Sequence, residues 1–195
     1  EYGFKLVFPN AGDLTSAGFG KVANVPAIFD SEPGYARLPS RFLIDRAIGS
    51  WDASGRGAKP NPRPPSRISI KNFGYWLCNA LEWAEVRGVD LMTCDYTTVL
   101  IGRYQTEMLK GIWSQDQNPL SPSTVNARVD LALEFQMWCA DKGHREPFFI
   151  PTQTRSYYVG SHTNSRSHEA KTVESRRGKV KANKHTLAFP SDDEI

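Results

Sequence analysis

The residues best suited to catalysis are few and widely separated in this chain. Its histidines are His144, His162, His168 and His185, and three of them lie in the polar segment after residue 150. The sequence contains no H-E-x-x-H metal motif, no Walker loop and no G-x-S-x-G nucleophile motif. Tyr157 and Tyr158 offer phenolic hydroxyls, but no arginine–histidine cluster accompanies them, so docking aromatics are the favoured interpretation. We therefore predict no catalytic site, no metal site and no cofactor in this chain.

Positive charge is the feature that points to a ligand. Residues 1–150 hold 16 Lys/Arg and 16 Asp/Glu, whereas the segment from Arg155 to Thr186 holds 8 basic residues against 2 acidic ones. A second basic stretch contains Arg56, Lys59, Arg63, Arg67 and Lys71, with no carboxylate between them. Two cationic segments around a neutral core favour an anionic polymer as partner, and a merely solvated surface is the alternative.

Length and composition limit the class of protein. The 195 residues, 39% of them hydrophobic, can form one ordinary domain with extensions or two small domains. No apolar run is long enough to span a membrane, and the first residues do not form a signal peptide, so we expect a cytoplasmic protein that does not engage a membrane. Cys78, Cys94 and Cys139 are too far apart for a zinc motif and predict buried free thiols.

Hydrophobic spacing predicts an all-α fold with a bundle of four helices. We expect the helices at about residues 38–51, 66–88, 95–111 and 121–143. Asp95 is a plausible N-cap, Pro122 suits a first helical turn, and Gly88, Gly111 and Gly143 mark helix ends. These helices would hold the basic residues that lie on them in fixed positions.

The two ends of the chain look different from its centre. Residues 1–35 are rich in glycine, proline and small residues and predict an irregular arm with little core of its own. Residues 151–195 predict a basic, mostly extended linker that ends in a capping box from Ser191 to Glu194, where we expect a truncated further domain to begin. Residues 36–150 would then be the helical domain.

The helical segments resemble the amino-terminal core-binding domain of tyrosine recombinases, the phage-type integrases. The resemblance rests on S-I-K-N-F-G-Y-W-L-C-N-A-L-E-W at 69–83, on L-S-P-S-T-V-N-A-R at 120–128, and on F-Q-M-W at 135–138. The ending L-A-F-P-S-D-D-E-I at 187–195 is similar to the entry into that family's catalytic domain. The fold that the resemblance implies is a SAM-like four-helix bundle.

The resemblance implies DNA binding without catalysis. The family's arginine, lysine, His-x-x-Arg and nucleophilic tyrosine have no matching positions in this chain, so the full-length protein, bacterial or phage-encoded, would be the DNA breaking and rejoining enzyme. The implied partners are double-stranded DNA of a recombination core site and, for the full-length protein, further protomers in a tetrameric synapse. We expect this part alone to be monomeric.

The expected DNA-binding residues lie at two helix entries and in the linker. They are Arg63, Arg67, Lys71 and Asn72 before and in the second helix, Thr124, Asn126 and Arg128 in the fourth, and Arg176, Arg177, Lys179 and Lys181 in the linker. An alternative function is a helical protein–protein module, in which Trp51, Trp76 and Trp113 would build a partner groove and the basic tail would only be solvated.

Overall fold

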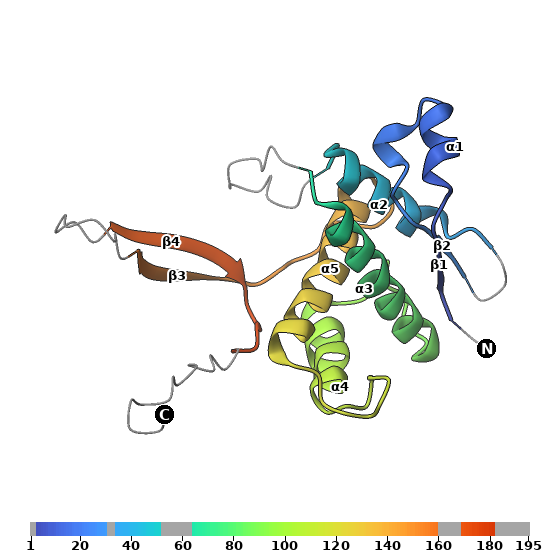
Figure 1. The fold of residues 1–195 in the computed structure, drawn as a ribbon. Helices are drawn as coiled ribbons and strands as arrows, with labels where there is room; N and C mark the ends of the chain where they lie inside the picture. Colours follow the sequence, from blue (N-terminus) through green and yellow to red (C-terminus); the bar gives the residue numbers. More distant parts are fainter. Residues whose placement is uncertain (1–2, 31–33, 52–63, 160–168, 182–195) are drawn as a thin grey trace, which may run out of the picture.

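The protein is mostly helical, and a hairpin extends from the helical body (Figure 1). The computed structural model describes residues 3–30, 34–51, 64–159 and 169–181. Its elements are β1 (Lys5–Val7), α1 (Ala11–Ser16), η1 (Gly20–Val22), β2 (Ala27–Phe29), α2 (Arg37–Ile48), α3 (Arg67–Val86), η3 (Tyr96–Gln105), α4 (Thr106–Leu109), α5 (Pro122–Asp141), β3 (Thr152–Val159) and β4 (Glu169–Arg176). The predicted helices correspond to α2, α3, η3 with α4, and α5, so their existence is confirmed.

Local capping explains where the longer helices begin. Ser66, Asp95 and Ser121 each accept a hydrogen bond from the backbone N–H three residues later. This satisfies a donor that the first helical turn would otherwise leave unpaired. The N-cap prediction at Asp95 is confirmed. Gly111 and Gly143, with φ of +74° each, have the left-handed conformation that ends a helix.

The third predicted helix differs from a regular α-helix. Residues Tyr96–Gln105 form a π-helix, and only Thr106–Leu109 continue as α-helix. Its consecutive residues Tyr104 and Gln105 are both buried, and both side chains reach other elements. Extended π-helix is rare and is often found near functional sites.

The N-terminal residues are part of the fold, which corrects the expectation of an irregular arm with little core. Strands β1 and β2 pair antiparallel, with Leu6 opposite Ile28. Ile28 is fully buried, and Ser40 on α2 accepts a hydrogen bond from its backbone N–H at 2.9 Å. A Cβ on Gly74 of α3 would lie only 3.0 Å from Leu6, so this strand pair sits tightly against α3.

The core contains two clusters, each with a fully buried tryptophan. Trp83 lies in a cluster to which α3, η3, α4 and α5 contribute. Trp138 lies in a cluster to which α2, β2, α3 and α5 contribute. Their indole N–H groups donate to Glu107 and Asp45, each at 3.0 Å, so neither buried donor is unpaired.

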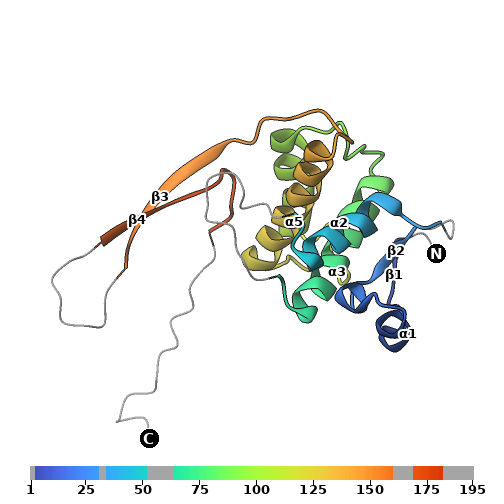
Figure 2. The ribbon, with the colours of Figure 1, turned by 90° about the horizontal axis from the view of Figure 1, so that it is seen from above.

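The C-terminal segment is extended but paired, which the linker prediction missed. Strands β3 and β4 form an antiparallel ladder from Thr152 opposite Arg176 to Val159 opposite Glu169. Figures 1 and 2 both show this hairpin, which we call the ribbon, extending away from the helices. The predicted capping box at 191–194 and the histidines at 162, 168 and 185 lie outside the described residues.

Candidate nucleic-acid interface

One side of α3 is exposed along most of its length. We call Arg67, Ile68, Lys71, Asn72, Tyr75 and Asn79 the α3 outer face, because steps of three and four residues place them on one side of the helix. Ile68 is 72% exposed and Tyr75 50% exposed, whereas Ile70 and Leu77 on the other side are buried. This face contains three residues that the sequence predicted as DNA-binding, namely Arg67, Lys71 and Asn72.

Lys71 is the central cation of the α3 outer face. Its Nζ lies 5.8 Å from the ring centre of Phe8 and 5.9 Å from that of Tyr75. Both rings attract the ammonium group weakly and hold it at the surface. Among the described residues, neither Lys71 nor Arg67 forms an ion pair. Both charges are therefore available to an anionic ligand.

Arg128 joins α5 to the α3 outer face. Its Nη1 donates to Asn79 Oδ1 at 3.1 Å, and the hydroxyl of Tyr104 donates to the same oxygen at 2.9 Å. The buried Nε of Arg128 has no hydrogen-bond partner among the described residues. Burial raises the pKa of Tyr104, so the hydroxyl keeps its proton and remains a donor.

Sequence reasoning found Arg128 but missed Asn79 and Tyr104. Asn79 lies seven residues after Asn72, which is two helical turns, so helical spacing alone could have added it to the face. No sequence signal pointed to Tyr104, because its contact with Asn79 depends on how η3 packs against α3.

Asn126, which the sequence predicted as DNA-binding, uses its side-chain amide within the protein. Its Oδ1 accepts from the backbone N–H of Val180 at 3.0 Å, and its Nδ2 donates to the backbone oxygen of Val180 at 2.8 Å. Thr124 belongs to the helix cap, since its hydroxyl lies 2.9 Å from that of Ser121. Both residues hold local structure.

Two of the four predicted linker contacts are also used within the protein. Arg176 is only 6% exposed, and its guanidinium forms an ion pair with Asp130 and donates to the hydroxyl of Tyr96 at 3.2 Å. Lys179 pairs with the other oxygen of Asp130 at 3.0 Å. In this structure Arg176 is thus committed to a contact within the protein, and Lys179 shares the same carboxylate.

Arg177 and Lys181 remain exposed, and neither forms an ion pair with a described residue. Arg63, with Arg56 and Lys59 of the same basic stretch, lies outside the described residues. Of the predicted DNA-binding cations, those that are exposed and form no ion pair with a described residue are thus Arg67 and Lys71 on α3 and Arg177 and Lys181 after β4.

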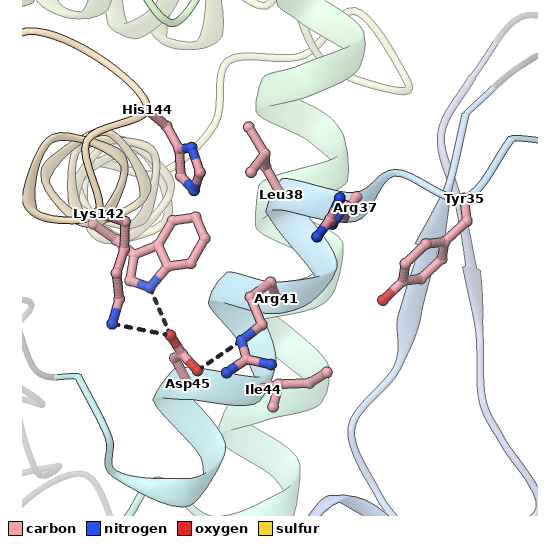
Figure 3. A pocket seen from close by; sticks show the side chains of 9 residues that line it. Tyr35, Arg37, Leu38, Arg41, Ile44, Asp45, Lys142 and His144 are labelled. Carbon is pink, nitrogen blue, oxygen red and sulfur yellow. Dashed lines mark hydrogen bonds and ion pairs between the residues drawn. The ribbon is translucent and has the colours of Figure 1, made fainter.

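A second group of charged residues surrounds a pocket between α2 and the end of α5 (Figure 3). Asp45 is buried there, and its carboxylate accepts from the Trp138 indole and pairs with Arg41 at 3.1 Å and Lys142 at 3.7 Å. The ring of His144 lies against Trp138, with ring centres 5.7 Å apart. The Asp45 carboxylate is therefore engaged by three side chains of the protein itself.

The tryptophans proposed for a partner groove all pack partly against the core. Trp51 packs edge-on against Phe42 and contacts both core clusters, and Trp113 packs against the cluster that contains Trp83. Trp76 is half-buried beside Phe73. The protein–protein module stays an alternative prediction.

The thiol prediction is confirmed for the most part. Cys78 and Cys139 are buried, Cys94 is half-buried, and all three are free. Within the described ranges, no group of three or more His, Cys, Asp or Glu residues could hold a metal ion. Of the helices described, none is long and apolar enough to cross a bilayer.

Comparison with known proteins gives no family assignment: no family model matches the chain, and neither the curated proteins nor the solved structures contain a significant match.

Proposed function

We propose that this chain binds double-stranded DNA, with the α3 outer face and Arg128 against the duplex. The observation that carries the proposal is the composition of this face: two cations without an ion-pair partner among the described residues, two amide side chains and an exposed aromatic ring on one rigid helix. Cations suit phosphates, and asparagine amides suit the edge of adenine.

The dimensions of the face support this orientation. From Lys71 to Asn79 the helix rises about 12 Å, which is close to the width of the major groove of B-DNA.

The resemblance to tyrosine recombinases extends the proposal to a biological role. In this interpretation the helices form a SAM-like core-binding domain that contacts recombination core-site DNA. The full-length protein would cut and rejoin DNA with a catalytic domain, and further protomers would assemble on the same DNA. In this proposal the role of the described residues is to bind the DNA.

A pair of matched lysine variants tests the binding surface. Lys71→Ala removes a cation from the α3 outer face, and Lys110→Ala removes an exposed cation that follows α4. We expect the first to weaken binding several-fold in fluorescence anisotropy with a duplex, while the second leaves binding unchanged. Equal effects of the two variants would contradict the proposed surface.

Asn72→Ala tests sequence readout separately. Loss of a bidentate amide contact with adenine would cost about 1–3 kcal/mol at one base pair and would relax the preference there. A protein–protein module predicts instead that duplex DNA does not bind at all, and that partner binding is insensitive to salt.

A further inference from the structure

We propose that the pocket between α2 and the end of α5 binds a small molecule through a phosphate monoester group. This site is separate from the proposed DNA interface. Arg128, which contacts the α3 outer face, is fourteen residues before Lys142 at the pocket, so about 21 Å along α5 separates the two.

The pocket has the size of a site for a small ligand. Its volume is about 550 Å³, and small-molecule sites are commonly about 300–1,000 Å³. Three parts of the chain line it, namely Tyr35, one side of α2 and the residues that follow α5 (Figure 3).

Positive charge exceeds negative charge in this pocket. Arg37, Arg41 and Lys142 line it, and Asp45 is the single carboxylate among its described lining residues. Two positive charges are therefore in excess. A phosphate monoester carries a charge of about −1.5 to −2 at pH 7 and matches this excess, whereas a carboxylate would match only half of it.

Asp45 fixes Arg41 in place and leaves most of its guanidinium open. The Nε of Arg41 pairs with Oδ1 of Asp45 at 3.1 Å, and the Arg41 side chain is 63% exposed. The two terminal nitrogens of Arg41 donate to no described residue (Figure 3). A guanidinium held in this way offers a preformed fork of donors, which is the geometry that binds phosphate oxygens well.

Arg37 supplies a second guanidinium one helical turn before Arg41. It is exposed and forms no ion pair with a described residue. Cations four residues apart repel each other, and a cation in a first helical turn opposes the helix dipole. The first turn of α2, which the structure describes in full, contains no acidic residue that would compensate. An anion bound between the two arginines would relieve both unfavourable interactions.

Two exposed rings lie on either side of these arginines (Figure 3). Tyr35 is 50% exposed, and its ring lies edge-on to Phe29 with ring centres 5.8 Å apart. The ring of His144 is held against Trp138. Both rings give the organic part of a phosphate ester a surface to pack against, which inorganic phosphate cannot use.

Calorimetric titration of the full chain with phenyl phosphate, inorganic phosphate and benzoate tests the site. Phenyl phosphate should bind most tightly, because inorganic phosphate lacks the ring and benzoate has a single charge. Arg37→Gln removes one exposed cation of the pocket and should weaken binding of phenyl phosphate about tenfold or more. Lys110→Gln removes an exposed cation elsewhere and should leave this binding unchanged.

Nuclear magnetic resonance locates the bound molecule. Phenyl phosphate should shift the signals of the Arg41 Nε–H and of the His144 ring. The proposal is overturned if the wild type does not bind phenyl phosphate, if the two variants bind it equally, or if benzoate or inorganic phosphate binds as tightly. Displacement of phenyl phosphate by duplex DNA would make the pocket a contact for DNA, which overturns this proposal and leaves the proposed function standing.

Discussion

A substitution at Asn126 tests whether this residue contacts DNA or stabilises the fold. Its amide makes two hydrogen bonds with the backbone of Val180, at 3.0 and 2.8 Å. A protein hydrogen bond contributes about 0.5–1.5 kcal/mol, so Asn126→Ala should destabilise the attachment of residues 176–181 by about 1–3 kcal/mol. Because 1.4 kcal/mol is about tenfold in an equilibrium constant, opening of this segment should rise about 5- to 150-fold.

Amide hydrogen exchange at Val180 measures this opening directly. Asn126→Asp is the matched variant, since its carboxylate still accepts from the Val180 N–H but cannot donate to the Val180 oxygen, and its effect should be about half as large in free energy. Asn72→Ala, on the exposed α3 outer face, should leave the exchange of Val180 unchanged. The reasoning is refuted if Asn126→Ala alters the preference among DNA sequences while Val180 remains protected.

Two further predictions concern the core. Asp45→Ala leaves the buried indole N–H of Trp138 unpaired and should lower the free energy of unfolding, measured by urea titration, by about 1–3 kcal/mol. Asp141→Ala removes the acceptor of the exposed indole N–H of Trp51 and should lower it by less than about 1 kcal/mol. Equal costs for the two variants would contradict this ranking. Burial raises the pKa of Cys78 and of Cys139 to about 12, so both thiols keep their protons in the folded state at pH values where unfolded thiols, with a pKa near 8.5, ionise. These two thiols should therefore leave the free energy of unfolding unchanged below about pH 8.5 and lower it above that pH by up to about 1.4 kcal/mol per pH unit for each thiol. If a variant with both cysteines replaced by alanine retained the full pH dependence, this reasoning would be contradicted.

The helices were predictable because their signals are local. Ser66, Asp95 and Ser121 cap the residues that follow them, and the apolar spacing lies within each segment. The strand pairs were missed for the opposite reason. Leu6 pairs with Ile28, about twenty residues later, and the polar strands β3 and β4 show little of the apolar alternation that marks a half-buried sheet.

Only the local features of the candidate site were predictable from the sequence. Lys71 and Asn72 are exposed in the first turns of a helix, as residue type and spacing indicated. The internal contacts of Asn126 and Arg176 could not be foreseen, because their partners, Val180 and Asp130, are 54 and 46 residues away in the chain. Polar residues at helix entries suit a ligand or another part of the same chain equally well, and only tertiary packing decides between them.

The salt dependence of binding to duplex DNA tests the central claim most directly. The open cations Arg67, Lys71, Arg177 and Lys181, together with Arg128, offer about five phosphate contacts. Titration of a fluorescent duplex at increasing salt should then give a slope of log affinity on log salt of about −4 to −5. A slope indistinguishable from zero, or no binding at low salt, would contradict the account.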